Sequence, residues 1–112
     1  MALAKVSAPV PVIEKIHEKI YAACSAPGAL NMNQWHSCDT THCRAGWVVT
    51  LAGDAGKELE MRTSTLFAAQ QIYHASGHDI SPCRFFDSDK AAMDDMRRLA
   101  EEEAAKAPTA AN

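Results

Sequence analysis

The sequence has few of the features that would indicate a sheet or a repeat architecture. Only five glycines and five prolines occur in 112 residues, and no alternation of apolar and polar residues extends beyond a few positions. We find no internal repeat and no segment of low complexity. Strands that are half buried need such alternation, so the sequence argues against a protein built mainly from sheets.

Long hydrophobic segments are also missing. The most apolar stretch, residues 45–53, has about half the length that is needed to cross a bilayer. Near the N-terminus there is one lysine, and Pro9 and Pro11 interrupt the short apolar run that a secretory signal would need to keep continuous. We therefore expect no membrane partner and a cytoplasmic location, where the four cysteines would stay reduced or bind a metal.

Composition and charge favour one folded domain. The chain is 47% apolar and 22% charged, and its length suffices for a single core. A net charge of -3 gives no general attraction to phosphate backbones, so nucleic acid is not the expected ligand. We expect a loose arm over residues 1–10, a single helical domain over residues 11–106 and a disordered tail over residues 107–112.

Apolar periodicity predicts an all-α fold, a compact irregular bundle of about four helices. The helices are expected near residues 11–25, 41–53, 64–76 and 88–106, with residues 57–62 adding one or two turns. The clearest stripe is on the first helix, where apolar residues recur every three or four positions. His17 lies on that stripe, and we interpret it as a core histidine with a hydrogen bond.

The remaining segments allow more local predictions. The connector over residues 29–37 is too apolar for a solvated loop, so Leu30, Met32 and Trp35 should cover part of the core. Gly46 costs about 1 kcal/mol within a helix, which indicates that another segment packs closely against it. Ser64 or Thr63, and Ser88, are expected to begin the last two helices. Asp94, Asp95 and residues 101–103 are expected to be exposed.

The most distinctive segment is W-H-S-C-D-T-T-H-C-R-A-G-W, residues 35–47. It resembles a motif in small bacterial and phage-encoded proteins of uncharacterised function, some of them fused to pentapeptide repeats. The resemblance covers about a fifth of the chain, and the matching residues are Trp35, Cys38, Thr40, Cys43, Ala45, Gly46, Trp47, Leu51, Ala52 and Gly53. The chain departs from the motif at Asp39, where many of these proteins have glycine, and only some of them have a histidine that matches His42. The resemblance implies a phage or mobile-element accessory protein in a bacterial host cell.

A zinc site is one interpretation of this segment. His36, Cys38, His42 and Cys43 supply the four imidazole and thiolate ligands that zinc prefers. Adjacent residues on a helix point about 100° apart, however, so His42 and Cys43 would not easily share one ion. One of them could be replaced by a ligand from elsewhere in the chain: Cys24, His74, His78 or Cys83.

Thiol chemistry is a second interpretation. If Thr40 caps the helix, Cys43 occupies its third position, where free backbone N–H groups stabilise a thiolate, and His36 or His74 could act as the base. Two alternatives remain, a disulfide between Cys38 and Cys43, and a buried Cys43 without chemistry.

The purely structural interpretation is that Trp35 packs on Trp47 while Thr40 or Thr41 caps the helix. Because no complete catalytic set is recognisable, the leading functional hypothesis is a non-enzymatic accessory protein that binds another protein and could inhibit a host or defence factor. The alternative is an enzyme that depends on zinc or on a cysteine of this segment. The sequence leaves the oligomeric state open.

Overall fold

The computed structural model describes residues 10–106. Apart from Val10, the expected arm over residues 1–10 and the expected disordered tail over residues 107–112 lie outside the described residues. No helix between residues 10 and 106 combines the length and the hydropathy that crossing a membrane requires.

The described chain is mostly helical, as predicted, but it is not entirely so. Five α-helices, one short 3-10 helix (η1) and a two-stranded antiparallel hairpin follow one another along the chain, in the order α1 Ile16–Cys24, β1 His36–Cys38, β2 Thr41–His42, α2 Arg44–Leu51, α3 Gly53–Arg62, α4 Thr65–Ala75, η1 Pro82–Phe86 and α5 Asp89–Lys106. The prediction of about four helices is close, and the prediction of an all-α fold is wrong at the hairpin.

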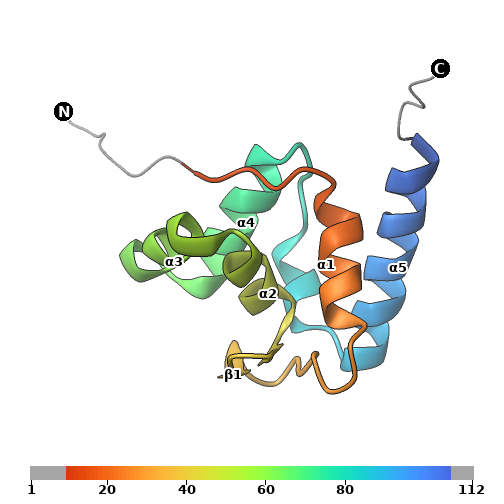
Figure 1. Ribbon diagram of the computed structural model, residues 1–112, viewed down its shortest axis with the longest axis horizontal. Coiled ribbons are helices and arrows are strands. Elements are labelled where there is room, and N and C mark those ends of the chain that lie inside the picture. The colour runs from red at the N-terminus through yellow and green to blue at the C-terminus, as the bar shows by residue number, and fades with distance from the viewer. Residues whose placement is uncertain (1–9, 107–112) are drawn as a thin grey trace.

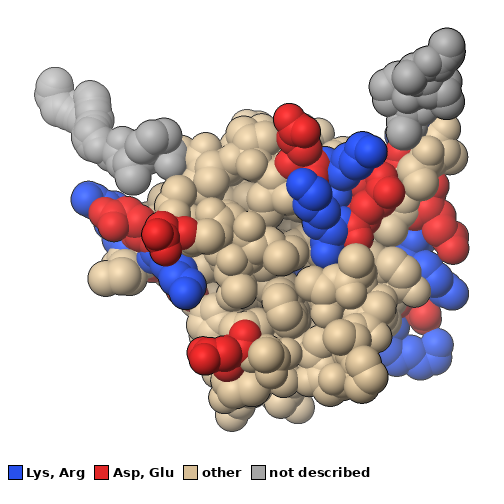
Figure 2. Space-filling model, in the orientation of Figure 1, with Lys and Arg blue, Asp and Glu red and all other residues tan. Residues whose placement is uncertain are grey.

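The helices form two neighbouring groups around one core. α1 and α5 lie side by side, α2 packs against α3 and α4, and the hairpin lies at the end of α2 where that helix begins (Figure 1). Their apolar faces meet in a continuous cluster in which the largest fully buried apolar side chains are Tyr73, Phe85, Ile16, Ile20, Ile72 and Met96. Charged side chains gather over α1, α5 and α3, while the face between these helices is largely uncharged (Figure 2).

The first helix begins five residues later than the pattern predicted. Pro11 and its neighbours are not helical, and the backbone N–H of Ile13 donates to the hydroxyl of Ser76 at the end of α4. Lys15 then adopts a left-handed conformation, with φ 54°, immediately before the helix. Burial of Ile13 against α4 therefore competes successfully with continuation of the helix towards Pro11.

The second helix also begins later than predicted, because residues 41–42 form β2. Cys43 is the N-cap in place of Thr40 or Thr41, and its thiol accepts a hydrogen bond from the backbone N–H of Gly46. The close approach predicted at Gly46 is confirmed. A Cβ added there would lie 1.9 Å from the carbonyl oxygen of Trp35, so only glycine lets the connector cross the helix at this point.

The later boundaries agree better with the sequence. Ser64 caps α4 through the N–H of Phe67, and Ser88 accepts from the N–H of Ala91 at the start of α5, both as predicted. The helical turns expected over residues 57–62 belong to α3, which begins earlier, at Gly53, where a φ of 71° turns the chain.

An ion pair that the sequence analysis missed joins α2 to α5. The guanidinium of Arg44 is fully buried, and it donates to the Tyr73 hydroxyl at 3.1 Å and to Asp95 at 2.7 Å. Asp95 also pairs with Arg84 on η1 and with Arg98 on its own helix. The expectation that Asp95 is exposed is therefore wrong, because its side chain is only 15% exposed and balances a buried cation.

Candidate functional site

The hairpin holds the Cys/His segment in a fixed position at the start of α2. His36 pairs with His42 and Cys38 with Thr41, and the N–H of Cys43 donates to the Trp35 carbonyl. On its other side, His42 exchanges backbone hydrogen bonds with the connector, its N–H donating to the Ala29 carbonyl at 3.0 Å. The backbone of His42 is therefore fixed from both sides.

Two histidines and one glutamate form a hydrogen-bonded chain beside the hairpin. Nδ1 of His36 lies 2.7 Å from Nδ1 of His42, and Nε2 of His36 lies 2.7 Å from a carboxylate oxygen of Glu60 on α3. That same oxygen accepts from the hydroxyl of Thr65 at 2.7 Å, and Nε2 of His42 lies 3.0 Å from the Asp39 carbonyl. Each end of the chain is thus a pure acceptor.

Both outer partners of the two rings are hydrogen-bond acceptors. The Asp39 carbonyl and the Glu60 carboxylate can only accept, so the Nε2 atom of each ring is the donor to its partner. The contact between the two Nδ1 atoms is a hydrogen bond when one of them carries a proton. The chain of contacts therefore links the hairpin to α3 through the two imidazole rings.

Cys38 has the environment of a reactive thiol. It is exposed in β1, and its sulfur lies 3.6 Å from the Thr40 hydroxyl. Hydrogen bonds from the Thr40 side chain first, then from the Thr40 backbone and from Thr41, lower the pKa of Cys38 from 9.0 to about 7. At neutral pH a large share of this thiol is therefore present as the nucleophilic thiolate.

Cys43 has the opposite environment. Only 1% of it is exposed, and burial raises its pKa even though backbone N–H groups, that of Gly46 foremost, favour the thiolate. It is the N-cap of α2 and not the third residue of the helix. The two cysteines of the motif therefore differ in exposure and in the direction of their pKa shifts.

The four ligands of the predicted zinc site are not gathered at one point. The structure brings His36 and His42 together, but each ring already uses both nitrogens, and the sulfur of Cys43 faces the Gly46 N–H. Within residues 10–106, one group of three metal-ligating side chains has all its ligand atoms within 4.8 Å of one another. That group includes none of these four residues. The suggested replacements lie elsewhere: Cys24 is buried on α1, His74 contacts Asp79, His78 contacts Glu103, and Cys83 lies on η1.

The other residues of the motif position the hairpin. The ring of Trp47 stands edge-on to that of His42, and its indole N–H donates to the Ala29 carbonyl at 2.7 Å. Trp35 does not pair with it as predicted, but contacts Phe86 edge-on at 5.9 Å between ring centres. Trp35 stays 39% exposed, so it covers the core less than expected, whereas Leu30 and Met32 pack against it.

A surface pocket of about 560 Å³ adjoins the hairpin. We call it the hairpin pocket, and it is lined by His36, Ser37, Cys38, Asp39, His42, Thr50, Lys57, Glu60 and Met61. His36 and Cys38 both border it, and the register shift between them interrupts the alternation of side chains along β1, so Ser37 borders it as well. The arrangement places an acidified thiol, two hydrogen-bonded imidazoles and a lysine around one space.

Glu60 is the residue of this site that the sequence analysis missed. It lies 24 residues from His36, within a charged stretch typical of a solvated helix face, and no local spacing links the two.

Comparison of the chain with protein-family models, with curated proteins and with solved structures gave no match.

Proposed function

We propose that the protein acts through Cys38 as a thiol nucleophile, in acyl transfer to water or to another acceptor. The observation that supports this best is an exposed thiol, with its pKa lowered to about 7, bordering the same pocket as the hydrogen-bonded His36–His42 pair. Nucleophilic cysteines are activated by a lowered pKa or by a neighbouring imidazolium. The proposal requires reduced Cys38, which is the state expected in a bacterial cytoplasm.

The reaction uses the proton of the histidine pair twice. The Cys38 thiolate attacks a carbonyl carbon and forms a carbon–sulfur bond, and the leaving group departs with the proton that the two rings share. Water then attacks the thioester and returns a proton to the pair. The carbon–sulfur bond breaks, the acid is released, and the thiolate is restored.

Glu60 has a positioning role in this scheme. Its carboxylate holds the His36 ring through Nε2, in the way that a third group orients the base in other nucleophilic sites. A dithiol mechanism fits less well, because the nearest cysteine in the sequence, Cys43, is buried and has a raised pKa.

The rate of alkylation with iodoacetamide as a function of pH tests the thiol. Lowering a thiol pKa from 9.0 to about 7 raises the thiolate fraction at pH 7 about 50-fold but also weakens the nucleophile, so the net gain is about sixfold. We expect the rate at Cys38 to rise with a midpoint near pH 7. C38S should abolish the alkylation that has this midpoint, whereas C83S, which lacks the other exposed thiol, should retain it.

Acylation by p-nitrophenyl acetate, followed by mass spectrometry of the intact chain, tests the chemistry. We expect one acetyl group on Cys38, and faster release of acetate in the native protein than in H36N or E60Q. H74N is the matched control, because His74 also pairs with a carboxylate but lies outside the hairpin pocket. Equal acylation of Cys83, or a Cys38 midpoint near pH 9, would refute the proposal.

A second candidate function is protein binding, the accessory role that the resemblance implies. It is favoured by an exposed aromatic pair, Trp35 and Phe86, of which Phe86 is 64% exposed, beside a pocket of about 220 Å³ that Met32 also lines. Aromatic side chains dominate the binding energy of many interfaces. Pull-down from the native host should then lose its captured protein with F86A and keep it with V12A, a change at another exposed apolar residue.

A further inference from the structure

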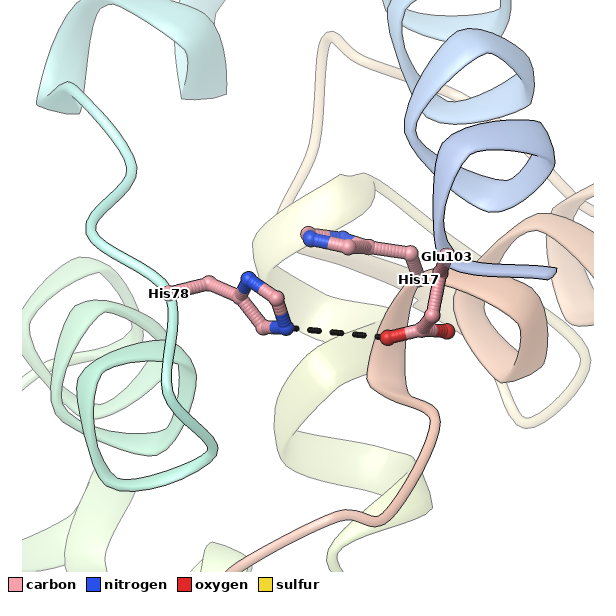
Figure 3. A group of neighbouring side chains, drawn as sticks. All are labelled: His17, His78 and Glu103. Atoms are coloured by element: carbon pink, nitrogen blue, oxygen red, sulfur yellow. Dashed lines mark ion pairs between the residues drawn. The ribbon is translucent and has the colours of Figure 1, made fainter. Parts of the chain in front are cut away.

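A second cluster of titratable side chains lies far from the hairpin, between the first and last helices. His17 comes from α1, His78 from the loop after α4 and Glu103 from α5. One ligand atom of each lies within 4.8 Å of the ligand atoms of the other two. Figure 3 shows the three side chains meeting from these three segments, with the His78 ring directed at the Glu103 carboxylate.

A ring nitrogen of His17 is suited to bind a metal ion. It is only 6% exposed, and its ring centre lies 4.0 Å from that of His78. The buried ring is thus fixed beside the His78 ring, where a ligand atom of each lies within reach of one ion.

Glu103 is already held in place by the helix that supplies His17. One of its oxygens accepts from the backbone N–H of Glu18 at 2.9 Å, and the other lies 3.6 Å from Nε2 of His78. The carboxylate is 15% exposed. It therefore lies next to both imidazoles without depending on a flexible surface conformation.

The cluster borders a cavity of about 350 Å³ between α1 and α5. The cavity is also lined by Glu18 and Glu102, and by Lys15 and Lys106. Within residues 10–106 the second carboxylate oxygen of Glu18 is buried and has no hydrogen-bond partner. A buried carboxylate oxygen without a donor is costly, and a bound cation with its water ligands would satisfy it.

We propose that His17, His78 and Glu103 form a binding site for a divalent transition-metal ion, with zinc as the preferred ion. Two imidazoles and one carboxylate are a ligand set that zinc uses when a fourth position stays open to water. Bonds of about 2.1 Å in a tetrahedron separate ligand atoms by about 3.4 Å. The 3.6 Å contact between His78 and Glu103 is already near that value.

The site would join three segments that are distant in the sequence. His17 and Glu103 are 86 residues apart, so an ion bound by both links the first helix to the last one and attaches the loop of His78 to them. Binding to the folded chain alone stabilises the fold by mass action. The cavity that the three side chains border has room for a water ligand, and Glu18 also lines it.

Calorimetric titration of the full chain with Zn²⁺, after treatment with a chelator, tests the site. We expect one equivalent to bind and to raise the melting temperature. H78A and E103Q should weaken binding by at least about tenfold, the loss that even an outer-shell partner causes. Two matched controls should bind normally, H74A at an exposed histidine and E102Q at a neighbouring glutamate of the same cavity.

Cobalt(II) distinguishes this site from the Cys/His segment. Bound at His17, His78 and Glu103, it should give visible d–d bands without a sulfur charge-transfer band, and C38S should leave the spectrum unchanged. Absence of stoichiometric binding would refute the site and leave an ion pair between His78 and Glu103. Binding that survives H78A and E103Q but is lost in H36A or C38S would place the metal in the hairpin pocket and would also refute it.

Discussion

The substitution Gly46→Ala tests the packing on which the hairpin depends. Alanine has the higher helix propensity by about 1 kcal/mol, so the change would stabilise an isolated helix. In the protein, however, the new Cβ would lie 1.9 Å from the Trp35 carbonyl oxygen and 3.0 Å from the Cβ of His42. A backbone carbonyl cannot rotate away as a flexible side chain can, so the connector must move.

The cost has two parts. Overpacking costs about 1–3 kcal/mol. Displacement of the Trp35 carbonyl also breaks its hydrogen bond from the Cys43 N–H, which adds about 1–3 kcal/mol for a buried group left without a partner. After subtraction of the propensity gain, we expect the free energy of unfolding to fall by about 3 kcal/mol.

Urea denaturation followed by tryptophan fluorescence measures this change, because both tryptophans flank the site. The variant A55G, at an exposed position of α3, calibrates the propensity alone and should lose about 1 kcal/mol. If Gly46→Ala left the protein equally stable or more stable, the connector would not cross the helix as described, and the position of His36 would lose its support.

Two further predictions concern the rest of the fold. Burial opposes ionisation of Asp95, but Arg44 and Arg98 stabilise its charge, so its pKa is lowered. The stability that Asp95 contributes is therefore complete above the pKa of the unfolded chain and is lost as pH falls through the lowered pKa of the folded protein. Calorimetry from pH 5 to pH 2 should show a steeper loss of stability in the native protein than in D95N, a substitution that costs about 3 kcal/mol at pH 7. A weak pH dependence that is identical in both proteins would contradict this assignment. Removal of the cap in S64A should cost about 1 kcal/mol in urea denaturation, and no loss would mean that the hydroxyl of Ser64 does not satisfy the Phe67 N–H.

The sequence was most informative where the physics is local. Periodicity located most of the helical segments because burial of one face repeats every three to four residues. Ser64 and Ser88 could be identified because a cap bonds within its own turn. Gly46 could be identified because a glycine inside an apolar helix is costly unless a neighbour needs the space.

The hairpin could not be predicted because its strands are too short to have a period. β1 and β2 contain three and two residues, and they depend on backbone bonds to residues 29–31 of the connector. These bonds commit residues 41–42 to a strand and delay the helix until Arg44, so Thr40 and Thr41, the two candidates for the N-cap, become hairpin residues. The competition is tertiary, and propensity gives no information about it.

The ionic partners were missed for a similar reason. Glu60, Asp95 and Glu103 all lie in charged stretches that resemble solvated helix faces, yet each faces a histidine or a buried arginine far away in the sequence. A buried cation such as Arg44 requires a carboxylate somewhere, but the sequence does not say which of fourteen acidic residues supplies it. Only the packing of α2 against α4 and α5 selects Asp95.

The different environments of the two cysteines in the motif have one geometric cause, the reversal of the chain between β1 and β2. The reversal places Cys43 at the buried start of α2, where its thiol satisfies a backbone N–H and is shielded from solvent. It leaves Cys38 on the outer strand, where Thr40 in the turn and Thr41 at the start of β2 donate to its sulfur and stabilise the thiolate. A helix beginning at residue 41, as periodicity alone suggested, would have removed these donors from Cys38. The acidified thiol therefore exists because tertiary contacts shorten the helix.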